Sequence, residues 1–241
     1  MTTQPRRSDG WPLLISRKQG MLAFGLIMVV TFAGCATPQL NTFKKRAAQG
    51  DYEWIAAQKV NCLRSSDDCG RRYLIKGDAC FRLAKAGTMA ADNYTCAAGA
   101  LAQGLALKQS WSDTATQRQF QENLCESLIN LQVLQAGQAA EKTLVRLTRA
   151  AEGLYRMAPG SVPAVYYLAK ARLHQIEPVL SNMNPTDRVP VCNRLKRTLT
   201  GVLSMMERAK QTPIPDWNRF AANYQRLSFD LGSAIRMAEC R

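Results

Sequence analysis

The chain has 241 residues and a formal net charge of +14, so it is long enough for one substantial core or a short repeat array. The basic balance favours nucleic acid, anionic lipid or an acidic polymer as a partner, but no nucleic-acid signature with interleaved aromatic residues is present. The single histidine, His174, severely limits general acid–base catalysis at neutral pH, and it has no second histidine or cysteine at helical spacing to form a metal site.

Residues 1–34 have the three-part layout of a secretory signal peptide. Arg6, Arg7, Arg17 and Lys18 form a basic region, and the uncharged apolar stretch 21–33 follows it. As a helix, this stretch would rise only about 20 Å, against about 30 Å for the hydrocarbon core of a bilayer. It is too short for a comfortable transmembrane span, and we expect residues 1–34 to be removed on export.

The stretch Phe32-Ala33-Gly34-Cys35 resembles the lipobox of bacterial lipoproteins, although Phe32 replaces the usual aliphatic residue. The resemblance implies a diacylglycerol on the Cys35 sulfur, cleavage before Cys35 and acylation of the new amine. Ala36 stands where an acidic residue commonly signals retention in the inner membrane, so the resemblance implies the periplasmic face of the outer membrane of a Gram-negative bacterium. The alternatives are an uncleaved signal anchor and a soluble periplasmic protein cut at another small residue.

The mature chain is then expected to consist of a lipidated tether at residues 35–42 and a helical-repeat domain at residues 43–241. A basic cluster lies at the start of this domain, and it consists of Lys44, Lys45 and Arg46. Cations so close to a lipid anchor could rest on anionic headgroups, each adding about 1 kcal/mol near the surface. The alternative is an ordinary solvated helix face.

Seven cysteines remain if Cys35 carries lipid, and export would place them in an oxidising compartment where disulfides persist. Because seven is odd, at least one cysteine stays free or pairs between chains. The preferred pairs are Cys62–Cys69, Cys80–Cys96 and Cys192–Cys240, which leaves Cys125 buried. No Cys-x-x-Cys motif is present, and we predict no metal site.

The pattern of the mature chain predicts an all-α fold, because apolar residues recur at spacings of three and four and alternating strand patterns are absent. Gly- and Asp-containing breaks divide the chain into eight or nine helices joined by short connections, which favours antiparallel helical hairpins. We expect irregular structure around residues 177–190.

Three stretches, "GDYEWIAA", "YLIKGDACFRLAKAG" and "AAEGLYRMAPGSVPAVYYLAKARL", resemble parts of tetratricopeptide repeats. In the last, Pro159 would end one helix before the next begins. The resemblance implies a short right-handed α-solenoid, capped by the helix in "DWNRFAANYQRLSFDLGSAIRM". The alternative is a helical bundle that contains one repeat-like hairpin.

A solenoid of this kind exposes a concave face, lined by the first helix of each hairpin. The binding candidates on this face are Tyr73, Lys76, Tyr166, Tyr167, Lys170 and, less centrally, Trp54. Tyrosine and lysine suit extended peptides or anionic groups. The alternative is that the tyrosines fill the layers between helices.

No catalytic motif accompanies these features. The glycines of "GALAQGLA" have the spacing of a phosphate loop but lack the following Lys-Ser/Thr, so they indicate close helix packing. We predict no catalytic residue and no cofactor. An enzyme such as a cell-wall hydrolase is the least favoured function.

The sequence favours a non-enzymatic adaptor: a lipid-anchored helical array that docks another protein of the envelope. The second hypothesis is a small anionic ligand bound for transport, because the chain is similar to the T-component lipoproteins of tripartite ATP-independent periplasmic transporters. Those proteins combine a lipid anchor with cryptic tetratricopeptide repeats. Nucleic acid is not an expected partner.

Overall fold

A computed structural model describes residues 37–62, 66–108, 113–180 and 183–240, and these residues form nine α-helices and no strand. The helices are α2 (Thr37–Ala48), α3 (Tyr52–Ala57), α4 (Asp67–Lys85), α5 (Ala90–Leu107), α6 (Thr114–Leu134), α7 (Gly137–Met157), α8 (Val162–Leu180), α9 (Pro185–Gln211) and α10 (Trp217–Met237). None of these helices is long and apolar enough to cross a membrane.

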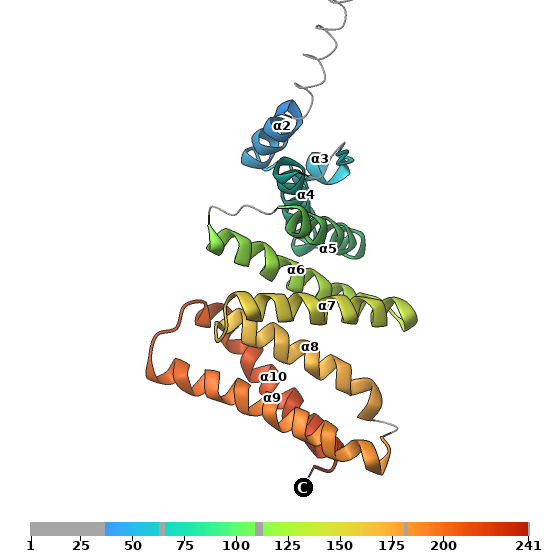
Figure 1. Cartoon of the computed structure of the whole chain (residues 1–241), viewed down its shortest axis with the longest axis vertical. Coiled ribbons are helices and arrows are strands. Elements are labelled where there is room, and N and C mark those ends of the chain that lie inside the picture. Colours follow the sequence, from blue (N-terminus) through green and yellow to red (C-terminus); the bar gives the residue numbers. More distant parts are fainter. Residues whose placement is uncertain (1–36, 63–65, 109–112, 181–182, 241) are drawn as a thin grey trace, which may run out of the picture.

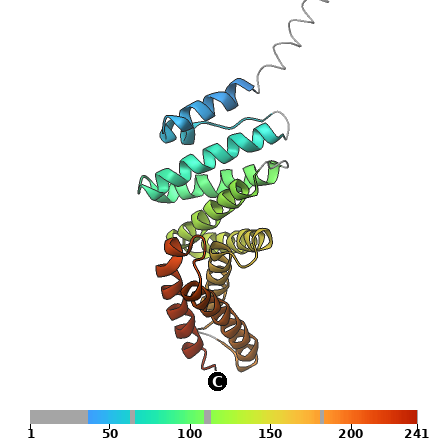
Figure 2. The ribbon, with the colours of Figure 1, turned by 90° about the vertical axis from the view of Figure 1, so that its left-hand side faces the viewer.

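The helices stack along the long axis of the molecule, with α2 at one end and the α9–α10 pair at the other (Figures 1 and 2). Each helix packs against the next along the chain, and the even-numbered helices also pack against one another in the order α2, α4, α6, α8, α10. The odd-numbered helices of the described chain make no substantial contact with each other. This alternation confirms the predicted all-α solenoid of helical hairpins.

The helix ends follow the expected capping chemistry. Ser66 accepts a hydrogen bond from the Cys69 amide at the start of α4, and Asp113 accepts from Ala115 and Thr116 at the start of α6. Helix α7 ends at Met157, two residues before Pro159, as the sequence predicts.

The prediction of irregular structure around residues 177–190 is largely wrong. Helix α8 continues through Pro178 to Leu180, and α9 already begins at Pro185 and contains Pro190. Residues 181–182 lie outside the described part of the chain. Pro185 suits the first turn of α9, where its missing N–H would have no helical partner in any case.

The folded part of the chain begins earlier than predicted, because the expected tether at 35–42 overlaps α2. Leu40 and Phe43 are buried, and Phe43 packs with Ile55, Val60 and Ala79 in a small core between α2, α3 and α4. A helix with one apolar stripe is stable only where that stripe is covered. The tether prediction is therefore wrong for residues 37–42, whereas Cys35 and the predicted signal peptide lie outside the described residues.

The three predicted disulfides are all present. Cys62–Cys69 joins the segment before α4 to its first turn, Cys80–Cys96 joins α4 to α5, and Cys192–Cys240 joins α9 to the residues after α10. Cys125 is the free cysteine of the described chain, and it is buried in α6 as expected. Cys80–Cys96 and Cys192–Cys240 each reinforce a local hairpin of the solenoid, whereas Cys62–Cys69 fixes the segment before α4 to that helix.

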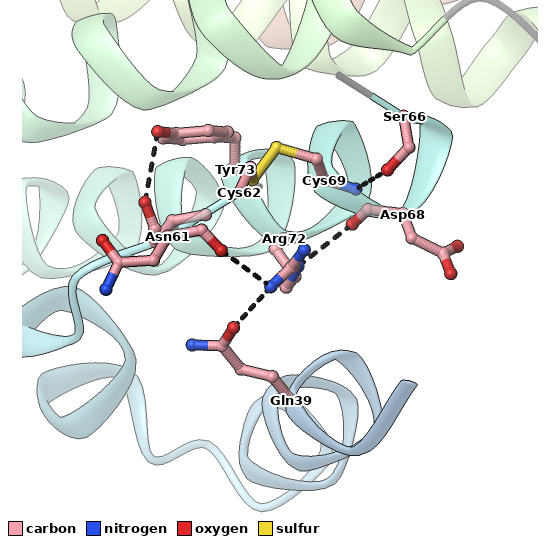
Figure 3. The surroundings of a disulfide bond; sticks show 9 residues. Gln39, Asn61, Cys62, Ser66, Asp68, Cys69, Arg72 and Tyr73 are labelled. Atoms are coloured by element: carbon pink, nitrogen blue, oxygen red, sulfur yellow. Dashed lines mark hydrogen bonds between the residues drawn. A yellow bond between two sulfur atoms is a disulfide. The ribbon is translucent and has the colours of Figure 1, made fainter. Parts of the chain in front are cut away.

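Arg72, beside the Cys62–Cys69 bridge, fastens α2 to the rest of the array (Figure 3). It is 5% exposed and donates hydrogen bonds to the Gln39 side chain on α2, to the Asn61 carbonyl at 3.2 Å and to the Asp68 carbonyl at 3.4 Å. A buried guanidinium needs several acceptors to offset its desolvation. Because these acceptors come from three segments, Arg72 holds the N-terminal helix in a fixed position on α4.

Candidate functional site

The predicted concave-face residues of α4 face the rest of the protein. The Tyr73 hydroxyl donates to the Val60 carbonyl at 3.3 Å, and the Lys76 ammonium donates to the Gln58 carbonyl at 2.5 Å. Burial lowers the pKa of Lys76. These two side chains therefore hold the segment after α3 against α4.

The predicted residues of α8 are covered by α10. Tyr167 is buried, and Tyr166 packs its ring against Tyr167, Phe220 and Tyr224 at centroid distances of 5.2, 5.3 and 5.9 Å. The Lys170 ammonium lies 3.7 Å from the Asp230 carboxylate on α10. The structure thus corrects the predicted binding face at these positions: the tyrosines fill a layer between helices, which was the alternative interpretation.

The basic cluster on α2 is partly engaged. Arg46 pairs with Asp51 at 2.6 Å and lies over the Trp54 ring at 5.0 Å, so both Arg46 and Trp54 already have contacts within the N-terminal part of the described chain. Lys44 and Lys45 are exposed on α2. The two lysines are therefore accessible, and their contact with anionic lipid headgroups stays a prediction.

A groove between α7 and α9 provides the most developed surface site. Its floor is α8, where Val165, Leu168 and Arg172 form a stripe on the face opposite the tyrosines. Two adjoining cavities of about 570 Å³ and 290 Å³ make up the groove, and both are lined by Leu168, Arg172, Arg197 and Thr198. The groove exists because α7 and α9 both pack on α8 and make at most a marginal contact with each other.

The groove is strongly basic. Among the described residues, its walls and floor carry four arginines, and Glu152 is the one carboxylate that lines it. The arginines are Arg172, Arg194, Arg197 and Arg208. All four are exposed, and within the described residues none of their guanidinium groups is paired with a carboxylate. Four unpaired cations beside a single acid create a positive potential that attracts anionic groups.

Two other lining positions show that a hydrogen bond links the floor of the groove to the α7 wall and that the groove is open to solvent along α9. The Gln175 amide donates to the Thr148 hydroxyl at 2.9 Å, which links α8 to α7 at one end of the groove. On α9, a Cβ added at Gly201 would meet no atom within 4 Å, so the groove is open above this residue. A ligand can therefore enter along α9 without displacing a side chain at Gly201.

Sequence reasoning missed these arginines as a site. Arg194 and Arg197 lie beside the apolar stripe of α9 and resemble an ordinary solvated helix face. The useful signal is the position of Arg172 on α8, about half a helical turn away from the tyrosines. That position places an arginine on the face of α8 that the tyrosines do not occupy.

The side chains with potential chemistry, His174 and Cys125, do not line the groove. The His174 Nδ1 lies 2.9 Å from the Glu177 carboxylate, and burial raises the pKa of the Cys125 thiol far above its ordinary value. No group of three or more metal-ligating side chains occurs in the part of the chain that the structure describes.

Glu122 is the only buried carboxylate among the described residues. It lies 2.5 Å from Arg219 on α10 and 3.3 Å from Arg118 on α6, and it is 3% exposed. Burial raises the pKa of Glu122, and the two arginines oppose this rise only in part. The cluster joins α6 to the first turn of α10.

Glu122 is expected to make stability depend on pH. Because its pKa is raised in the folded protein, the folded state binds the proton more tightly than the unfolded chain does. Its contribution is therefore greatest below the ordinary pKa of about 4.5 and falls as the pH rises through the raised value. Urea unfolding between pH 4 and 7 should show that Glu122→Gln loses this dependence, whereas parallel curves for both proteins would contradict it.

No protein-family model matches the chain, and no curated protein matches it significantly. The likeness to tetratricopeptide repeats and to transporter-associated lipoproteins therefore stays a prediction from the sequence. The proposed function therefore rests on the fold and on the groove.

Proposed function

We propose that the protein is a lipid-anchored, non-enzymatic adaptor of the bacterial envelope, which uses its helical solenoid to dock another protein. The observation that carries the docking role is the groove with four arginines that have no carboxylate partner among the described residues, on a solenoid cross-linked by disulfides. Three disulfides are typical of proteins exposed to an oxidising compartment, and this supports export. The lipobox-like stretch before Cys35 supports the anchor.

The position of α2 supports this proposal, because it determines how close to the membrane the solenoid would lie. Because α2, the first helix of the described residues, begins at Thr37, only one residue separates it from Cys35. A lipid on Cys35 would hold the fixed α2–α4 unit directly at the membrane, with Lys44 and Lys45 close to the headgroups. Confinement of the solenoid at a surface raises the effective concentration of an envelope partner.

Lipidation is tested by substitution of the proposed acceptor. In a Gram-negative host supplied with labelled palmitate, Cys35→Ser is expected to lose the label and to leave the membrane fraction. Cys125→Ala is the matched control, because it removes the buried free thiol and keeps Cys35. Label retained by Cys35→Ser, or lost equally from both variants, would contradict acylation at Cys35.

The adaptor role is tested by crosslinking in the native cells. A photo-reactive amino acid at Ser204, which lines the groove, is expected to give a discrete adduct with one envelope protein. The same amino acid at Phe229, an exposed position on α10, is the control for collisional labelling. The absence of a discrete protein adduct from the groove position would argue against docking there.

A second candidate function is small-ligand binding for a transport system. The larger cavity, about 570 Å³, falls within the range of about 300–1,000 Å³ that is common for ligand pockets. Co-purification of a small anion with the lipidated protein, together with no protein adduct, would favour this function over the adaptor.

A further inference from the structure

We propose that the groove between α7 and α9 binds an extended, acidic segment of a partner protein, about six residues long. This inference rests on the proposed docking function and names the chemistry of the docked segment. Its evidence is the charge, the length and the floor of the groove.

The charge of the groove selects carboxylates. Arginine presents a planar fork of N–H donors that matches a carboxylate in two parallel hydrogen bonds. Arg172 on the floor faces Arg194 and Arg197 on the wall, and in the described chain all three guanidinium groups lack a carboxylate partner. An acidic segment would supply the missing partners.

The length of the groove favours a polypeptide over a single anion. Arg194 and Arg208 both line it and are fourteen positions apart on α9, which corresponds to about 21 Å along a helix. An extended chain rises about 3.3 Å per residue, so about six residues span this distance. A phosphate or a free carboxylic acid would reach the arginines at one end only.

The floor of the groove specifies a pattern within the segment. The half-buried Val165 and the edge of the buried Leu168 on the floor, with the buried Met205 on the α9 wall, line the groove between the arginines with apolar groups. In an extended chain, successive side chains point to opposite sides. The segment that fits best therefore alternates acidic residues, which reach the arginines, with apolar residues, which cover the floor.

The position of the groove argues against anionic lipid as its occupant. Helix α2, which follows Cys35, lies at one end of the stack, whereas α9 lies at the other (Figure 1). An anchor at Cys35 would bring Lys44 and Lys45 to the headgroups and leave the groove away from them. The groove is thus placed to meet a protein.

The test measures peptide binding to the full chain, purified in an uncharged detergent. The probe is a six-residue peptide of alternating glutamate and leucine with an uncharged fluorophore, followed by fluorescence anisotropy. We expect saturable binding that weakens with salt, and no binding of the same peptide with glutamine in place of glutamate. Arg194→Glu/Arg197→Glu is expected to weaken binding at least about tenfold.

Two further variants separate the groove from general charge and from misfolding. Lys142→Glu/Arg156→Glu changes the net charge equally on the exposed surface of α7 outside the groove, and it is expected to bind as the wild type does. Gly201→Trp fills the groove from a position where a Cβ meets no atom, and it is expected to block binding without loss of the helical circular dichroism.

Several outcomes would overturn the inference. Equal weakening by both charge variants would show non-specific attraction, and displacement of the peptide by inorganic phosphate at similar concentrations would show a small-anion site. Loss of binding to phosphatidylglycerol vesicles in the groove variant alone would show a lipid site. A protein adduct in cells that survives Arg194→Glu/Arg197→Glu would keep the adaptor function and exclude the groove as its docking site.

Discussion

Replacing Gly77 by alanine is expected to lower the free energy of unfolding by about 2 kcal/mol, because α4 and α5 pack too closely for a side chain there. A Cβ at Gly77 would lie 2.6 Å from the Leu101 Cγ and 2.9 Å from the Leu101 backbone nitrogen. The contact is reciprocal, since a Cβ at Gly104 would lie 2.7 Å from the Leu74 Cγ. The better helix propensity of alanine, worth about 1 kcal/mol, offsets only part of this overpacking cost.

Gly99→Ala on α5 is the matched control for this prediction. A Cβ at Gly99 would meet no atom within 4 Å, so alanine there gains helix propensity without a clash. We expect urea unfolding, followed by circular dichroism, to show a stabilisation of about 0.5–1 kcal/mol for Gly99→Ala and a loss for Gly77→Ala. Two changes of the same sign would contradict the close α4–α5 approach.

These glycines show what the sequence could and could not predict. The prediction that the glycines of "GALAQGLA" indicate close helix packing is confirmed at Gly104, which lies against Leu74, and is wrong at Gly99, where a Cβ would meet no atom within 4 Å. The spacing alone does not show that Gly99 faces open space on the same helix, because that depends on which side of α5 the neighbouring helix covers. Propensity and periodicity are local, whereas the approach of two helices is not.

The fold and the disulfides could be predicted because they are built from neighbours in sequence. A hairpin solenoid brings Cys80 on α4 next to Cys96 on α5 once the short connection is recognised. The groove could not be predicted in the same way, because it is made by three helices and depends on α7 and α9 packing on α8 without substantial packing on each other. The tyrosines of α8 are predicted to bind a ligand because their side chains suit peptides and anionic groups, but α10 covers them.

Removing the Cys192–Cys240 disulfide is expected to have the larger effect, a loss of about 4 kcal/mol in the free energy of unfolding. The bridge closes a loop with a sequence separation of 48, which contains most of α9 and all of α10. In the loop-entropy account, a longer closed loop restricts the unfolded chain more strongly. Cys192→Ala/Cys240→Ala should therefore unfold at a clearly lower urea concentration than the wild type.

The same change is expected to loosen α10 first, because the bridge fixes its C-terminal end to α9. Phe220 and Tyr224 of α10 cover Tyr166 on α8, so hydrogen exchange should rise in α8 and α10 before it rises in α4 and α5. Cys62→Ala/Cys69→Ala is the control, with a sequence separation of 7 and an expected loss of about 2.5 kcal/mol. Equal losses from the two pairs, or exchange that rises uniformly, would show that the C-terminal bridge does not fasten the cap of the solenoid.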